Sequence, residues 1–548
     1  MRRLIVLWIG MMLLAAAPAA AQGRVPVPDI TRYADYAPAT APAFAVVRAD
    51  TGFREQTPAL LNRLEPVIGQ TDLNDFFDDI LNSPEINVFL GDGVGIIVLS
   101  PQVDFSDLMG DGSPFAIILG VKDPEAARAL LEESNDIVVE ERNGWKDYRM
   151  NDEVRALLRD DVMILTPNFP YADQVVSGDF GKLSADADFT AAINQLPADH
   201  YDFLLYGDLS ALVAAQSGQT SRGALAPASA LADMLGTGAV GGVSVGGRDL
   251  LLDVSWKYGD LDGISAFGFS PEMFTGPAVD LTLARRLAPD TQFYLQTVNF
   301  GGMLIQFFDL LNVMGGLMKD DASTEFFGLR GIVNENLGDT AKAAVTLALA
   351  AATGLSLDSD VLSVLEGDFA LHLSALAADT LLDFAPSLGI VMAESGQGEN
   401  YRRALVNSLD RAGMPISRIP LRGGGTAIDL SAFTDPFWGD FAGQAAAADP
   451  NFDTWFGAQG DFMALGTAPS VQFALQPGDE TLESTPGYQH AMQATFLEGA
   501  QGIAFINVAA LAGVLDIPAD VTDRVESLSA SAVADSAGML VRLAVSLR

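Results

Sequence analysis

Short runs of hydrophobic residues, each bounded by glycine, proline or acidic residues, recur along the whole chain. Runs of this kind predict β-strands, and the clearest are Phe44–Asp50, Leu90–Leu99 and Phe115–Gly120. After the third run, Asp123, Pro124 and Glu125 open a helical pattern, because Asp at the N-cap, Pro at the first position and Glu in the first turn favour a helix start. The pattern therefore predicts strands and helices mixed along one chain.

The order of these elements recurs in the second half of the chain. Phe203–Leu212 resembles Gly502–Leu511, and Asp161–Leu165 resembles Asp461–Leu465. Turn signals such as Gly246–Asp249 favour antiparallel pairing of the strands on either side. The predicted fold class is α+β and internally duplicated, with two related lobes of mainly antiparallel sheet and helices packed on one face.

The chain is predicted to have five parts. Residues 1–21 are predicted to be a signal peptide and residues 22–42, rich in proline and small residues, an extended leader. The first α+β repeat covers residues 43–257, a linker covers 258–289, and the second repeat, with extra helices, covers 290–548. A chain of this length is expected to form two domains.

The N-terminus has the pattern of a cleaved export signal. Arg2 and Arg3 precede an apolar run, Leu4–Leu14, and small residues follow up to Ala19–Ala21. The chain has no cysteine, so we expect neither a lipid anchor on a mature N-terminal Cys nor a disulfide. No later stretch is apolar for long enough to predict a transmembrane helix. We therefore expect a periplasmic protein.

The excess of acidic residues disfavours the binding of negatively charged partners. The chain has 71 Asp and Glu residues against 31 Lys and Arg, a net charge of −40. Between Gly423 and Asp523 there is no Lys or Arg at all. Nucleic acids and anionic lipid headgroups are bound through basic side chains, so neither is an expected partner. We interpret the charge as a means of keeping an exported protein soluble.

One segment carries a family resemblance. Gly354–Ala370, with the sequence GLSLDSDVLSVLEGDFA, resembles a recurring motif of uncharacterised exported bacterial proteins that are classed as a domain of unknown function. The first half of the chain keeps only the part at Leu90–Gly93. The resemblance implies an envelope location and a mixed α+β build, and it brings no known activity or catalytic residues.

Patterns that suggest catalysis are incomplete. Ser244 stands in a G-x-S-x-G pattern, but the residues that follow predict another strand instead of the helix that a nucleophile elbow needs. Gly396 and Gly398 resemble part of a dinucleotide-binding turn, yet Tyr401 occupies the position that requires Gly or Ala. The three histidines are scattered and no thiolate site is possible. We therefore predict no catalytic residue, no metal and no cofactor.

The strongest candidate surface is the apolar stretch Gly301–Lys319. Its polar residues Gln306, Asp309 and Asn312 form a narrow stripe on a predicted helix. The candidate residues for an apolar ligand or partner surface are Met303, Leu304, Phe307, Phe308, Leu311, Met314, Leu317 and Met318. Such a helix is either buried in the core, which we favour, or lines an adaptable cavity or groove for an apolar ligand.

These observations rank three functions. The leading hypothesis is a non-enzymatic exported binding or scaffold protein of the cell envelope, whose partner is an envelope protein. The alternative is a soluble carrier or chaperone for an apolar ligand, such as a lipid or an unfolded envelope protein. A carboxylate-based hydrolase comes third, because acidic residues are plentiful although no pair stands out.

Overall fold

The structure is a computed structural model, and its description covers the following residues: 31–50, 53, 84–101, 114–133, 137–150, 154–198, 200–208, 238–246, 248–257, 277–299, 301–302, 304–305, 308, 312, 336–353, 356–358, 362, 367–374, 388–393, 398–411, 413, 416–421, 425–431, 453–510, 519–535 and 538–548. The chain divides into two compact units. Unit 1 comprises Met1–Asp260 with Ala537–Val541, and unit 2 comprises Leu261–Ser536 with Arg542–Arg548.

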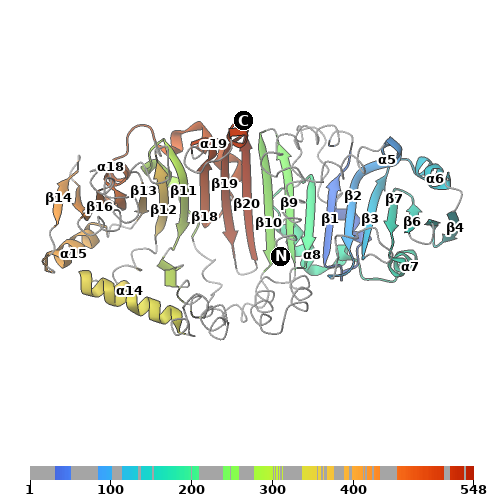
Figure 1. Cartoon of the computed structure of the whole chain (residues 1–548), viewed down its shortest axis with the longest axis horizontal. Coiled ribbons are helices and arrows are strands. Elements are labelled where there is room, and N and C mark those ends of the chain that lie inside the picture. The colour runs from blue at the N-terminus through green and yellow to red at the C-terminus, as the bar shows by residue number, and fades with distance from the viewer. Residues whose placement is uncertain are drawn as a thin grey trace. The chain divides into compact units, whose positions relative to one another are not determined.

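The described strands of unit 1 form one antiparallel array. In order across the sheet they are β10 (Asp249–Lys257), β9 (Ala239–Gly246), β8 (Phe203–Gly207), β1 (Ala43–Arg48), β2 (Leu90–Val98), β3 (Phe115–Val121), β7 (Val162–Thr166), β6 (Val154–Arg159), β5 (Trp145–Met150) and β4 (Ile137–Arg142). In Figure 1 the labelled strands β9, β1, β2, β3 and β7 follow one another in this order, with β8 between β9 and β1.

Helices cover both faces of this sheet. They are η1 (Arg32–Asp35), α5 (Pro84–Phe89), α6 (Pro124–Glu132), α7 (Phe169–Ser177), η3 (Leu183–Ala185) and α8 (Ala187–Gln195). The start of α6 follows the sequence prediction, since the Asp123 carboxylate accepts a hydrogen bond from the Ala126 backbone N–H at 3.0 Å. Helix α7 begins in the same way, with the Asn168 side chain accepting from the Tyr171 N–H.

The segment before β1 belongs to the core of unit 1. Tyr33, Ala34, Ala37 and Ala41 are buried there, in one cluster with side chains of α7, α8 and the sheet. Asp35 accepts a hydrogen bond from Ser184, and the backbone carbonyl of Tyr36 accepts one from Tyr171. Burial of apolar residues and these hydrogen bonds together fix residues 31–42 against the sheet.

Unit 2 is also built on antiparallel strands. Their order is β20 (Gly538–Leu547), β19 (Val525–Ala534), β18 (Gly502–Asn507), β11 (Thr291–Val298), β12 (Asp368–Ser374), β13 (Leu388–Ala393), β17 (Phe462–Thr467), β16 (Thr454–Gln459), β15 (Thr426–Asp429) and β14 (Ser417–Pro420). Its helices are η5 (Leu281–Arg286), α14 (Leu337–Thr353), α15 (Gly398–Arg411), α18 (Ala468–Leu475), η9 (Leu482–Ser484), α19 (Pro486–Thr495) and α21 (Ala519–Thr522).

The predicted fold class is wrong, because the helices are not packed on one face. In β5 the neighbouring residues Asp147 and Tyr148 point to opposite faces of the sheet, as successive strand residues must. Asp147 is joined through Arg155 to α7, whereas Tyr148 donates a hydrogen bond to Glu132 of α6. The described residues form a mainly antiparallel sheet with helices on either side.

In unit 2, too, helices pack against both faces of the sheet. Met463 packs in one cluster with Val406 and Leu409 of α15, while its neighbour Ala464 packs in another with Val471 of α18. Strands buried on both faces read as nearly continuous apolar runs, and the sequence pattern did not distinguish them from one-sided strands. The order of strand pairing is the same in both units, but a shared order does not by itself show an internal duplication.

No helix within the described ranges is long and apolar enough to cross a membrane.

Candidate functional site

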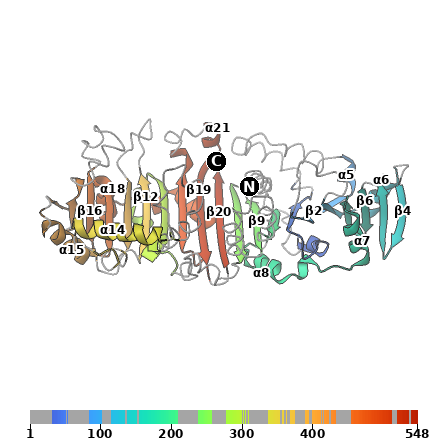
Figure 2. The same ribbon diagram turned by 60° about the horizontal axis from the view of Figure 1, so that its bottom comes forward.

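Among the described strands of unit 1, the most exposed is β4, at one edge of the sheet. It pairs with β5, and with no other strand in the described part of the chain. All five of its described side chains, residues 138–142, are exposed, and two of them are apolar: Val138 is 58% exposed and Val139 47%. In both ribbon views β4 lies at one end of the sheet of unit 1 (Figures 1 and 2). An edge strand of this kind offers backbone N–H and C=O groups to another strand.

A tight turn sets the position of β4. Asn143 and Gly144 connect β4 to β5 with φ of 52° and 79°. Two central residues with positive φ make the turn type that matches the twist of a hairpin, and Asn-Gly is the pair that favours it most. The Asn143 side chain also donates to the carbonyl of Val176 at 3.1 Å, which ties the turn to α7.

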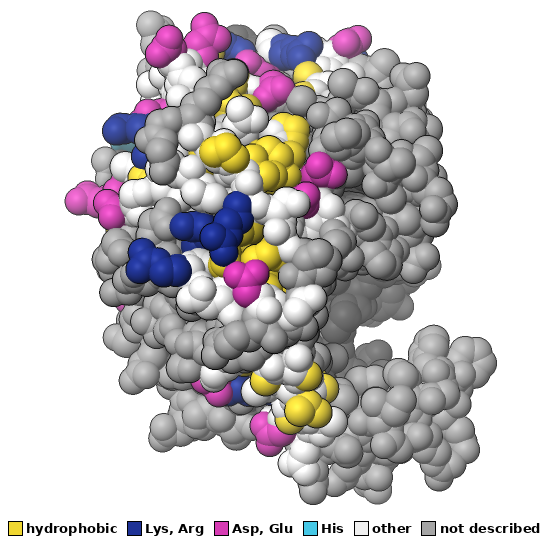
Figure 3. Space-filling view, turned by 90° about the vertical axis from the view of Figure 1, so that its left-hand side faces the viewer, with side chains coloured by type: hydrophobic (Ala, Val, Ile, Leu, Met, Phe, Trp, Pro, Cys, Tyr) yellow, Lys and Arg dark blue, Asp and Glu magenta, His cyan; other side chains and the backbone are white. Residues whose placement is uncertain are grey.

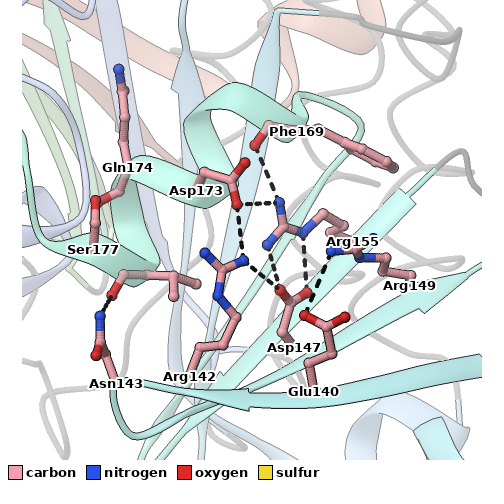
Figure 4. Close-up of polar contacts among 11 residues, drawn as sticks. Glu140, Arg142, Asn143, Asp147, Arg149, Arg155, Phe169, Asp173, Gln174 and Ser177 are labelled. Atoms are coloured by element: carbon pink, nitrogen blue, oxygen red, sulfur yellow. Dashed lines mark hydrogen bonds and ion pairs between the residues drawn. The ribbon is translucent and has the colours of Figure 1, made fainter.

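A buried ion pair holds β5 to β6. Arg155 of β6 and Asp147 of β5 are 2% and 0% exposed, and Arg155 Nε donates to Asp147 Oδ1 at 3.0 Å while Nη2 donates to Oδ2. Figure 4 shows the guanidinium and the carboxylate facing each other in a two-point contact. A paired Arg–carboxylate contact fixes orientation as well as distance. The strand beside β4 is therefore held in one arrangement.

The ion pair extends to α7 and to β4 itself. Arg155 Nη1 donates to Asp173 Oδ1 at 3.0 Å, and Arg142, the last residue of β4, donates to the same oxygen at 3.2 Å (Figure 4). The hydrogen bond from Arg155, and then its charge, hold the pKa of Asp173 below its usual value. Glu140 and Arg149 add a contact across β4 and β5 at 3.7 Å. The network thus connects a helix, two inner strands and the edge.

Aromatic side chains pack on both faces of the hairpin. Trp145, 1% exposed, lies edge-on to Tyr36 and has the guanidinium of Arg159 4.2 Å from its ring centroid. Tyr148 is buried on the other face and donates to Glu132 at 3.3 Å. Burial and the neighbouring Glu132 charge raise the pKa of Tyr148. The hairpin is therefore anchored on both sides, and β4 extends from a rigid support.

The outer strand of unit 2 is protected differently. Strand β14 pairs with β15 and ends in Pro420, which has no backbone N–H to offer. Proline at a sheet edge is a common means of preventing the addition of another strand. Strand β4 contains no proline, and Ile137, Val138 and Val139 are β-branched residues that favour extended structure.

The structure places two of the eight candidate residues from the apolar stretch. Phe308 is helical and 7% exposed, in a small cluster with Leu357 and Leu362, and Leu304 packs against the same cluster. These two side chains therefore contribute to packing. The other six candidates lie outside the described residues: Met303, Phe307, Leu311, Met314, Leu317 and Met318.

The catalytic patterns do not come together at β4. Ser244 lies inside β9, opposite Leu251 of β10, and is 1% exposed. His372 and Ser470 are in hydrogen-bond contact, with Nε2 3.0 Å from Oγ, but both are buried, at 2% and 5% exposure. No group of three or more His, Cys, Asp or Glu that could hold a metal ion occurs among the described residues.

Exposed apolar side chains also occur on unit 2. Val345 and Leu347 of α14 are 45% and 72% exposed. Figure 3 views the side of the molecule where α15 and β14 are labelled in Figure 1, and there the hydrophobic side chains form small groups with Lys, Arg, Asp and Glu beside them. Scattered exposed apolar residues are common on soluble proteins and do not by themselves mark a docking surface.

Comparison with known proteins adds little. No known protein family and no curated protein matches the chain. Among solved structures, crystal forms IV and I of TP0453 match with 8% and 9% identity, covering 43% and 44% of this chain and 81% of that protein. The TM-score is 0.23 in both comparisons, too low for this likeness to bear on fold or function.

Proposed function

We propose that this chain is a non-enzymatic, exported binding or scaffold protein of the cell envelope, and that it takes up an extended segment of a protein partner along β4. The observation that carries the proposal is the exposure of Val138 and Val139 on an edge strand supported by a buried ion pair. The signal-peptide pattern of residues 1–21 supports the periplasmic location.

If a partner segment pairs with β4 as an additional strand, β4 must be both exposed to the partner and held in a fixed position. A partner segment gains affinity from backbone hydrogen bonds to the free edge, and specificity from contacts with alternate side chains. Val138 and Val139 point to opposite faces, so each would contact a different side chain of the partner. Because β4 is already extended, little conformational entropy is lost on its side of the contact.

Site-specific photo-crosslinking tests this proposal. A photoreactive phenylalanine at position 139 is expected to crosslink to one segment of one envelope protein when the chain is exported in its source cell. The matched control is the same probe at Val88, which is 59% exposed on α5 of the same unit. A synthetic peptide of the captured segment is then expected to slow amide hydrogen exchange in residues 137–142.

A second variant distinguishes strand addition from simple apolar contact. Val138→Lys places a charge on the edge, which discourages pairing, and is expected to abolish the protection. Val88→Lys is expected to leave it intact. Equal crosslinking from positions 139 and 88, or a captured peptide that gives no protection of β4, would show that the edge is not the docking site.

The two other functions receive less support from the described residues. Of the eight candidate contacts for an apolar ligand, the two that the structure describes lie at a small cluster: Phe308 belongs to it and the partly buried Leu304 packs against it. For a hydrolase, His372 contacts two hydroxyl groups, those of Ser470 and Ser374, and a substrate would have to enter the core of unit 2 to reach these buried residues.

A further inference from the structure

A separate polar cleft lies in unit 1, where five segments of the chain meet. Its volume is about 420 Å³. The lining residues are Arg32, Asp50, Leu90, Gly91, Asp92, Val121, Lys122 and Asp161. Leu90 and Val121, 0% and 5% exposed, form its apolar part together with Gly91, whereas the other five lining residues are charged. A cleft of this size holds a small organic molecule.

The inner part of the cleft is fixed by hydrogen bonds. Asp92 Oδ1 accepts from Arg32 Nη2 at 2.7 Å and from the Tyr33 hydroxyl at 2.8 Å. Gly120 makes room for this contact, because a Cβ there would lie 2.3 Å from the Tyr33 hydroxyl and 3.0 Å from Asp92 Oδ1. Strand β2 also has a register irregularity between Leu90 and Val94 that displaces this stretch from regular pairing. Arg32 and Asp92 are thereby pre-positioned.

The charges of the cleft are satisfied to different degrees. Asp50 accepts hydrogen bonds from the buried guanidinium of Arg48, and Asp92 is neutralised by Arg32. Asp161 is 61% exposed and has a longer contact, 3.4 Å, to Arg32. Lys122 is exposed, and its Nζ donates to the backbone carbonyl of Asn87 at 2.9 Å. One anionic and one cationic group are therefore left with capacity for a ligand.

These two groups are close neighbours in the fold. The N–H of Val121 donates to the carbonyl of Asp161 at 2.7 Å, so Asp161 lies directly beside the end of β3, and Lys122 is the next residue. A ligand that carries both an ammonium and a carboxylate matches this pair. Phosphate-bearing ligands fit poorly, because Asp50, Asp92 and Asp161 would repel them.

We propose that the cleft binds a small zwitterion of the amino-acid or short-peptide class. The ammonium group contacts Asp161, and the carboxylate contacts Lys122, with the planar guanidinium of Arg32 beside it. Val121, 5% exposed, contacts the ligand's apolar atoms, whereas Leu90, 0% exposed, lies behind the surface that the ligand meets. This site is separate from β4, and its function does not depend on strand addition there.

Isothermal titration calorimetry at low ionic strength tests the proposal with alanyl-alanine as the probe. Saturable binding to one site is expected. The N-acetylated and the C-amidated dipeptides are each expected to bind at least about tenfold more weakly, the effect of losing one hydrogen bond to a charged group. Absence of saturable binding, or equal binding of the capped forms, would overturn the proposal.

Two variants locate the binding in the cleft. Asp161→Asn is expected to weaken dipeptide binding at least about tenfold and to remove the preference for a free amino terminus. Lys122→Met is likewise expected to weaken dipeptide binding at least about tenfold, and to remove the preference for a free carboxyl terminus. The control is Asp179→Asn, an exposed carboxylate after α7, which should bind as the unaltered protein does. Since Asp161 and Lys122 are exposed, both variants should fold, as circular dichroism can verify. Unchanged binding by either would place the zwitterion elsewhere and refute the assignment.

Discussion

The guanidinium of Arg155 and the carboxylate of Asp147 form an ion pair between neighbouring strands, with Nε 3.0 Å from Oδ1 and both side chains almost fully buried. Removing charges from water is costly, and a buried pair compensates only while both partners are present and well oriented. The pair therefore contributes mainly by keeping β5, and with it the edge strand β4, in a single position.

Arg155→Ala is expected to lower the free energy of unfolding by about 3–5 kcal/mol, because it removes both close hydrogen bonds to the buried Asp147 carboxylate and leaves only Arg142, 3.9 Å away. Urea unfolding measures this. Arg155→Met combined with Asp147→Leu should cost less than the two single changes added together. As a control, Arg418→Met breaks an exposed pair with Asp410 and should cost about 1 kcal/mol or less. Similar losses for Arg155→Ala and Arg418→Met would contradict this account.

Gly120→Ala is expected to destabilise unit 1 and to displace residues 31–42. The new methyl group would collide with the Tyr33 hydroxyl and press on Asp92, so the contact between them would have to open. Faster amide exchange in residues 31–37 is the expected readout. Gly178→Ala is an instructive comparison, because no atom lies within 4 Å of its Cβ position and only its φ of 71° is strained. It should leave exchange in residues 31–37 unchanged.

Phe308→Ala is expected to lower the free energy of unfolding by about 3–5 kcal/mol, the usual cost of removing a buried aromatic ring. Phe308 is 7% exposed and packs with Leu357 and Leu362. Denaturant unfolding would record the loss. If the free energy of unfolding changes by well below about 1 kcal/mol, the ring contributes little to packing. Such a result would favour the hypothesis that this stretch lines a ligand cavity.

Local features of the sequence predicted individual elements well. The run Phe115–Gly120 is observed as β3, Phe115–Val121, and Asp123-Pro124 does begin a helix. Asn507, at the end of β18, makes a contact of the same short range, since its side chain accepts a hydrogen bond from the Ala510 N–H at 3.2 Å. These features depend on residues near one another in the chain, so the pattern contains the information that determines them.

The candidate site could not be predicted in the same way. Asn143-Gly144 stands between two runs of mixed polar and apolar residues, and an Asn-Gly pair in this setting strongly predicts a hairpin. It would therefore have predicted the strands β4 and β5. Whether β4 is an edge or an inner strand depends on which distant segment pairs with it, and no local pattern specifies that. Asp147, Arg155 and Asp173 likewise follow no motif spacing, since strand pairing and α7 bring them together.

Stability should depend on pH through His372. This ring is buried in unit 2, where its Nε2 lies 3.0 Å from the Ser470 hydroxyl and its Nδ1 3.5 Å from that of Ser374. Burial lowers the pKa of His372 to about 4. Because this value lies below that of a histidine in the unfolded chain, protons bind more readily to the unfolded state. The stabilising contribution of neutral His372 is complete above about pH 6.5 and is lost as the pH falls through about 4.

The loss over this window should reach about 3 kcal/mol, since each pH unit by which the pKa is depressed corresponds to about 1.4 kcal/mol. Urea unfolding between about pH 7 and pH 4 would measure it. His372→Gln retains hydrogen-bonding groups but cannot take up the proton, so its stability should fall less steeply over the same range. His490→Gln, in α19, controls for loss of a histidine outside this cluster. If His372→Gln and the unaltered protein lose stability in parallel, the acid sensitivity arises from other groups and the buried ring is not its source.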